Sequence, residues 1–148
     1  MIVLASDHAG YSLKESIKNF LVKKGYEVKD VGAHALKKTD DYPQYMAKAA
    51  RLVQKDPINT RAIIIGGSGQ GEAIAANRFK KVRAVVYYGG ASKILTLSRE
   101  HNNANVLSLG ARFISEKDSK RAVSLWLSKK FSNAVRHKRR ITQIDRLG

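Results

Sequence analysis

The chain has 148 residues, 43% of them hydrophobic, and its 28 Lys and Arg residues outnumber its 12 Asp and Glu residues, giving a formal net charge of +16 at pH 7. A chain of this length and apolar content is expected to form one compact domain over residues 1–148. The absence of cysteine excludes disulfides, thiolate metal sites and a thiol nucleophile or base.

Short apolar runs alternate with amphipathic stretches in the first part of the chain. Residues 2–5 predict a buried strand, and apolar side chains with helical spacing over residues 13–21 predict a helix that ends at Gly25. The first apolar run is too short for a secretory signal, and no stretch reaches membrane-spanning length, so we expect a cytoplasmic location without membrane binding. A second strand is predicted over residues 26–31, and Pro43 marks the first turn of a second helix.

The most informative stretch joins an apolar strand at residues 61–65 to an Ala-rich helix predicted over residues 73–79. The loop between them, Gly66 to Gly71, has four glycines in six residues and exposes backbone N–H groups where an anion is favoured. Glu72 follows this loop directly. It can cap the helix, or it can act as a general base whose pKa is raised beside a bound anion. The residues alone leave both explanations open.

The second part of the chain continues the same alternation. Strands are predicted over residues 83–88 and 106–109, with a helix around residues 94–97 between them, and Ser115 is placed to cap the next helix. A basic C-terminal helix is predicted over about residues 131–148. This alternation predicts a three-layer α/β/α sandwich around a five-stranded parallel, Rossmann-like sheet.

Ligands of such folds bind beyond the carboxyl ends of the strands. Polar candidates follow three predicted strands there: Asp7 and His8, Ser68 and Glu72, and Arg112. For a single histidine in a loop, a solvated or structural role is the ordinary alternative. The glycine loop lacks the spacing of a dinucleotide fingerprint and the Lys of a Walker loop, and no zinc-like spacing or nucleophile elbow is present. The remaining hypothesis is that the site binds a small phosphate-bearing ligand and carries out acid–base chemistry on it.

A set of motifs occurs in one order along the chain. These are Asp7-His8-Ala9-Gly10, Asp41-Tyr42-Pro43, Gly67-Ser68-Gly69-Gln70-Gly71-Glu72 with Ala75-Ala76-Asn77, His101-Asn102 and Gly110-Ala111-Arg112, followed by Arg136-His137 and Arg140. Together they resemble the type B ribose-5-phosphate isomerases, over nearly the whole chain. The wider family also contains galactose-6-phosphate and allose-6-phosphate isomerases.

The resemblance implies interconversion of ribose 5-phosphate and ribulose 5-phosphate through an enediolate, in the pentose phosphate pathway, without a metal or an organic cofactor. One branch of the family has a cysteine base at the position of Gly66, and the other has a glutamate base at the position of Glu72, which this chain matches. Glu72 would carry a proton from the sugar C2 to C1.

The resemblance also implies roles for the other motif residues. Ser68 and the loop N–H groups, including those of Gly67, Gly69 and Gly71, would hold the enediolate oxygens. His101, with Asp7 nearby, would assist ring opening. Phosphate binding would fall to His8, Arg112, Arg136 and Arg140, and the sugar hydroxyls would contact Tyr42 and Asn102.

In this family the site is shared between subunits, which implies a homodimer or a dimer of dimers with the C-terminal helix packed on the partner. A six-carbon sugar phosphate remains an alternative substrate. The loops at residues 32–43 and 89–92 determine how large a sugar fits, and the sequence does not fix their shape. A non-enzymatic protein that binds anions or nucleic acid is the alternative from another class, supported by the net charge of +16. Nucleic acid is disfavoured, since no helix-turn-helix, zinc finger or aromatic-interleaved basic stretch is found and Glu72 would repel a phosphate backbone.

Overall fold

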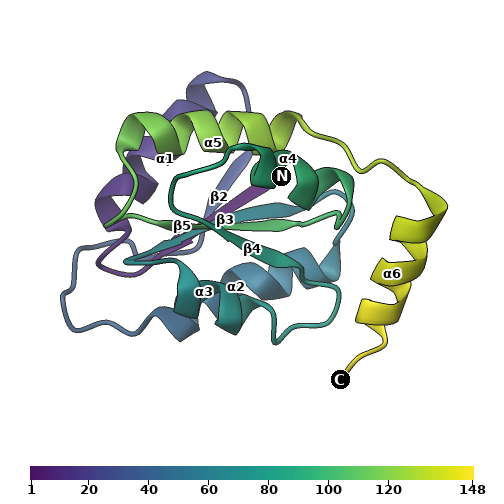
Figure 1. Ribbon diagram of the computed structural model, residues 1–148. Helices are drawn as coiled ribbons and strands as arrows, with labels where there is room; N and C mark the ends of the chain where they lie inside the picture. Colours follow the sequence, from purple (N-terminus) through teal and green to yellow (C-terminus); the bar gives the residue numbers. More distant parts are fainter.

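The computed structural model describes residues 1–148, in which strands and helices alternate along the chain (Figure 1). The strands are β1 (Ile2–Ser6), β2 (Val28–Asp30), β3 (Arg61–Gly66), β4 (Ala84–Tyr87) and β5 (Val106–Gly110). The helices are α1 (Tyr11–Lys23), α2 (Tyr42–Lys55), α3 (Gln70–Ala76), α4 (Lys93–Glu100), α5 (Glu116–Ser128) and α6 (Val135–Asp145).

All five strands are parallel and form one sheet in the order β2-β1-β3-β5-β4. Helices α1, α4 and α5 cover one face of the sheet, and α2 and α3 cover the other (Figure 1). The predicted three-layer α/β/α sandwich is therefore confirmed. None of the helices is both long and apolar enough to span a bilayer.

The central strands are apolar on both sides because helices cover both faces of the sheet. In β3, Ile63 and Ile65 pack toward α1, α4 and α5, whereas Ile64 packs toward α2 and α3. Trp126 of α5 is fully buried in the first of these two layers. This packing fixes the central strands, and with them the loops that follow β1, β3 and β5.

Several predicted boundaries need correction. Strand β2 is shorter than the predicted 26–31, because the N–H of Tyr26 bonds to the Leu21 carbonyl in the turn that ends α1. Helix α3 begins at Gln70 rather than 73, since Gly69 turns the chain into the helix with a φ of +78°. It ends at Ala76 rather than 79. The side chain of the next residue, Asn77, donates to the carbonyl of Ala84 and accepts the N–H of Ala84.

The C-terminal helix is also shorter than predicted, spanning Val135–Asp145 rather than residues 131–148. Helix α6 stands apart from both helical layers, beyond one end of the sheet (Figure 1). His137 is its only buried residue, and an ion pair of 3.2 Å between Arg83 and Asp145 ties its last turn to the start of β4. Most of the helix surface, including its arginines, is therefore exposed.

Candidate active site

The carboxyl ends of β1, β3 and β5 meet at one edge of the sheet. Ser6 pairs with Ile65, and Gly66 pairs with Gly110, so the three following loops begin side by side. The N–H of Arg112 then donates to the Gly67 carbonyl at 3.0 Å, which joins two of these loops directly. This edge carries the candidates Asp7, His8, Ser68, Glu72 and Arg112, as the strand-end argument predicts.

Glu72 lies in the first turn of α3 and is only 4% exposed. Its carboxyl group rests against the backbone of Gly66, where a Cβ would overlap the carboxyl atoms. Burial raises the pKa of Glu72, and the nearby Asp7 carboxylate adds to this effect, while the backbone N–H groups of Gly69 and Glu72 oppose it. The residue thus interacts with the helix start, as a capping acid does, but its burial and raised pKa are what proton transfer at neutral pH requires.

Two of the predicted binding side chains pack on glycines of the loop. A Cβ at Gly71 would lie 2.5 Å from the Tyr42 hydroxyl oxygen, and one at Gly67 would lie 3.1 Å from an Arg112 guanidinium nitrogen. The glycines therefore let Tyr42 and Arg112 approach the loop backbone closely. Ser68 is half-buried, and its hydroxyl oxygen accepts the N–H of Gln70 at 3.2 Å.

Asp7 and His8 lie in the turn between β1 and α1. The buried Asp7 accepts the N–H groups of Ala9 and Gly10 through Oδ1, at 3.0 and 3.3 Å. His8 contacts Asp40, a residue that the sequence analysis missed, because the polar stretch before α2 shows no periodicity that would single it out. Asp40 is joined to His8 by both a ring nitrogen and the backbone N–H, at 2.7 and 3.1 Å.

The side chains of Asp7, His8 and Asp40 lie close enough together to hold a cation, with one ligand atom from each within 4.8 Å of the others. However, Asp7 Oδ1 already accepts two backbone N–H groups, and the Nδ1 of His8 is bonded to Asp40. A nitrogen that donates a hydrogen bond cannot bind a metal ion through its lone pair. The present geometry is therefore that of a hydrogen-bonded cluster.

The remaining candidates lie at the opposite edge of the sheet. His101 directly follows α4, in the connection to β5, and its ring stacks on that of His137 of α6 with 4.3 Å between the ring centroids. Burial lowers the pKa of His137, and the charges of His101, Arg136 and Arg140 act in the same direction. Asn102 is exposed next to His101, as are Arg136 and Arg140 on α6.

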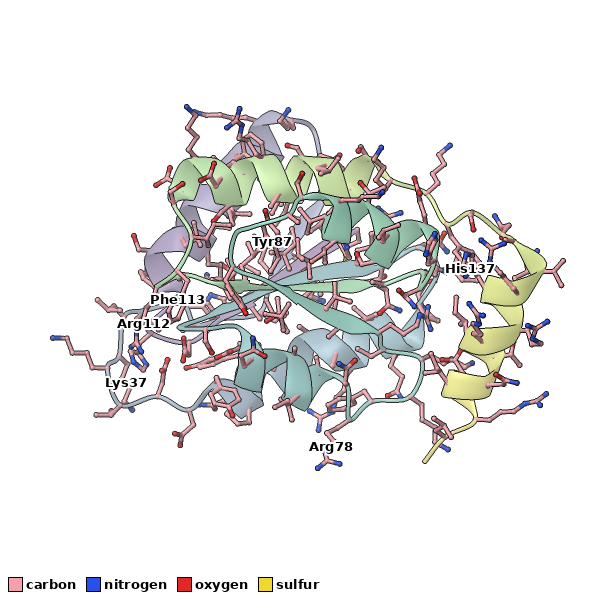
Figure 2. All side chains as sticks on the ribbon, in the orientation of Figure 1. Lys37, Arg78, Tyr87, Arg112, Phe113 and His137 are labelled. Atoms are coloured by element: carbon pink, nitrogen blue, oxygen red, sulfur yellow. The ribbon has the colours of Figure 1, made fainter.

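Within one chain His101 does not lie near Asp7, whereas the predicted site is shared between two subunits. The five residues of β5 separate the two edges by about 16 Å. In Figure 2, Arg112 lies at one end of the sheet and His137 at the other. A single chain therefore brings together Asp7, His8, Tyr42, Ser68, Glu72 and Arg112 with the glycine loop, but not His101, Asn102, Arg136 and Arg140.

Comparisons with known proteins agree with this architecture. Ribose-5-phosphate isomerase B of Escherichia coli K12 is 38% identical over 143 residues, which are 97% of this chain and 93% of the relative. The enzyme of Mycobacterium tuberculosis H37Rv is 37% identical over 140 residues, covering 95% of this chain and 85% of the relative.

Solved structures show the same likeness. Ribose-5-phosphate isomerase B from Mycoplasma genitalium, with bound ribulose-5-phosphate, superposes with a TM-score of 0.93 and 37% identity over 98% of this chain and 93% of that one. The Clostridium thermocellum enzyme has a TM-score of 0.90 and 40% identity, over 97% and 94% of the two chains. The model of the ribose/galactose isomerase family matches residues 2–144. The chain therefore belongs to the ribose/galactose isomerase family.

Proposed function

We propose that this chain interconverts ribose 5-phosphate and ribulose 5-phosphate, with Glu72 as the base, as a cytoplasmic enzyme of the pentose phosphate pathway. The observation that carries the proposal is the Glu72 carboxyl group, buried at the ligand-binding edge with a raised pKa. The ribulose-5-phosphate bound to the Mycoplasma genitalium relative, at 37% identity, supports a five-carbon substrate.

The contact between Glu72 and Gly66 supports membership of the glutamate branch. A side chain at residue 66 and the carboxyl group of Glu72 would occupy the same space, because a Cβ at Gly66 overlaps that carboxyl group. A cysteine base at residue 66 and a glutamate base at residue 72 would therefore act from one place over the end of β3, and each excludes the other. This chain has glycine at the first position and glutamate at the second.

The proposed step is a proton transfer within the open-chain sugar. Glu72 removes the proton from C2, the C–H electrons form the C1–C2 double bond, and the carbonyl oxygen at C1 becomes the enediolate oxygen. The proton of the C2 hydroxyl passes to the C1 oxygen, and the protonated Glu72 returns its proton to C1 as the carbonyl forms at C2. Ser68 and the loop N–H groups stabilise the negative charge on the oxygens as it develops. No step in this scheme requires a metal or an organic cofactor.

We infer that a partner subunit completes the site. His101, Asn102, Arg136 and Arg140 lie at the far edge of their own sheet, so they reach a substrate at Glu72 only from a second chain. The exposed arginines of α6, a helix anchored mainly by His137 and Asp145, suit this arrangement. In a two-fold dimer, each chain would contribute these far-edge residues to the site at Glu72 of the other chain, which produces two equivalent sites. A dimer of dimers would repeat this unit.

The test is the isomerisation of ribose 5-phosphate with and without EDTA, for the wild type and for Glu72→Gln. Glu72→Gln keeps the shape of the side chain and removes the base, so kcat should fall by about 10³-fold or more while inorganic phosphate binds nearly as before. The matched control is Glu116→Gln, because Glu116 also lies in the first turn of a helix but is exposed.

Substantial turnover by Glu72→Gln would rule out Glu72 as the base. A wild type inactive on ribose 5-phosphate but active on allose 6-phosphate or galactose 6-phosphate would instead establish the six-carbon alternative. Inactivity on all of these sugars would overturn the isomerase assignment itself.

A further inference from the structure

Asp40 makes the closest side-chain contact of His8, although the two residues are 32 positions apart. The Asp40 side chain is 2% exposed, and its Oδ1 accepts both the ring Nδ1–H and the backbone N–H of His8. A single carboxylate oxygen thus holds the ring and the backbone of one residue. The only other carboxylate near this ring, that of Asp7, lies 4.0 Å from Nδ1, which is too far for a hydrogen bond.

This contact decides which face of the imidazole is available to a ligand. Because Asp40 only accepts hydrogen bonds when ionised, Nδ1 must carry a proton, and Nε2 is the nitrogen left for other partners. The bonded edge of the ring faces a buried group, while the His8 side chain keeps 28% of its surface exposed. Although burial raises the pKa of Asp40, the hydrogen bonds from His8 outweigh it and keep the carboxyl group ionised.

We propose that Asp40 is a positioning residue that holds His8 with Nδ1 protonated and Nε2 directed at the substrate phosphate. This inference rests on the proposed function, in which His8 binds the phosphate. A phosphate oxygen that accepts a hydrogen bond from Nε2 completes a line of carboxylate, imidazole ring and phosphate, in which the ring donates to both negative groups. Asp40 acts on the substrate only through His8 and does not touch it.

The test is a double-mutant cycle on the binding of inorganic phosphate, measured by titration calorimetry. Asp40→Ala should weaken binding about tenfold, and His8→Ala should weaken it at least as much. If Asp40 acts through His8, then His8→Ala/Asp40→Ala will bind phosphate no more weakly than His8→Ala alone. In turnover assays, Asp40→Ala should raise KM about tenfold and leave kcat within about threefold of the wild type.

Asp41→Asn is the matched control, since Asp41 is the neighbouring exposed aspartate and makes no side-chain hydrogen bond to its helix. Proton NMR should show an exchangeable downfield Nδ1–H signal of His8 that Asp40→Ala removes and Asp41→Asn keeps. Asp40→Asn retains an accepting oxygen, so its phosphate affinity should fall between those of the wild type and Asp40→Ala. If Asp40→Ala does not fold, Asp40→Asn replaces it in the cycle.

Multiplicative losses in the cycle would overturn the proposal, because they would mean that Asp40 merely anchors its loop. Loss of the NMR signal without any change in phosphate affinity would overturn it as well. Phosphate binding does not depend on turnover, so a wild type without isomerase activity would overturn the proposed function while leaving the Asp40–His8 cycle measurable.

Discussion

A site shared between two chains predicts that two inactive variants will rescue one another. Glu72→Gln removes the base at the carboxyl edge, and His101→Ala removes the ring-opening histidine at the amino edge. About 16 Å of sheet separates the two edges in one chain, so each site would draw on Glu72 of one subunit and His101 of the other. A mixed dimer then contains one site with both defects and one site with none.

The size of the rescue follows from this geometry. When equal amounts of the two variants assemble at random, about half of the dimers are mixed, and half of the sites in those dimers are intact. The mixture should therefore reach about a quarter of the wild-type activity, although each variant alone is nearly inactive. The same fraction holds for a dimer of dimers, because each site still needs two chains.

The assay unfolds the two variants together, refolds them, and measures turnover of ribose 5-phosphate against separately refolded samples. The control mixture combines Glu72→Gln with Asp7→Asn, two changes at the same edge, and should show only the average of its parents. Activity of the first mixture that does not exceed the average of its parents would refute the shared site. An active chain that light scattering shows to be a monomer would refute it too.

Three further outcomes are expected. The acid limb of kcat/KM should lie above the ordinary pKa of a glutamate, because Glu72 must be ionised and its pKa is raised, mainly by burial. Because the Asp7 carboxylate adds to this effect, Asp7→Asn should move the limb to lower pH in rate profiles, and an unmoved limb would contradict the contribution of Asp7. Gly66→Ala should lower the free energy of unfolding, measured by thermal denaturation, by about 1–3 kcal/mol because the new methyl group overlaps Glu72; Gly66→Ala/Glu72→Ala should recover most of this loss. Burial raises the pKa of Asp30, but its contacts with Lys14 and Lys18 outweigh burial and hold this pKa at about 2, below the unfolded value. Ionised Asp30 should therefore add about 2 kcal/mol to the free energy of unfolding above pH 4. Denaturant titrations should show that this contribution fades as the pH falls toward 2 and is absent in Asp30→Asn.

The local features of the fold could be predicted because they depend on nearby residues. The Ser115 cap is an example: its hydroxyl oxygen accepts the N–H of Asp118 at 3.1 Å, as the sequence spacing predicts. Gly25, which ends α1 with a φ of +85°, is another. The boundaries that were wrong, such as those of β2 and α3, depend on hydrogen bonds from other parts of the chain or on the φ of one glycine.

Part of the candidate site could also be predicted, since parallel strands place their carboxyl ends at one edge. This rule brings Asp7, Ser68, Glu72 and Arg112 together without any knowledge of the strand order. It does not reach Asp40, which lies on no regular element and meets His8 only after the loop before α2 has packed. Nor does it show that any side chain at residue 66 would overlap the carboxyl group of Glu72.

The sequence by itself therefore determined the class of fold, and it predicted the edge at which a ligand would bind and Glu72 as the candidate base, because apolar periodicity and glycine spacing act over a few residues. Only the tertiary structure decided that His101 lies at the far edge from Asp7, that Asp40 holds His8, and that Glu72 is buried against Gly66. These relations join residues distant in the chain or set the burial of a side chain, and both depend on how the helices pack on the sheet rather than on any local pattern.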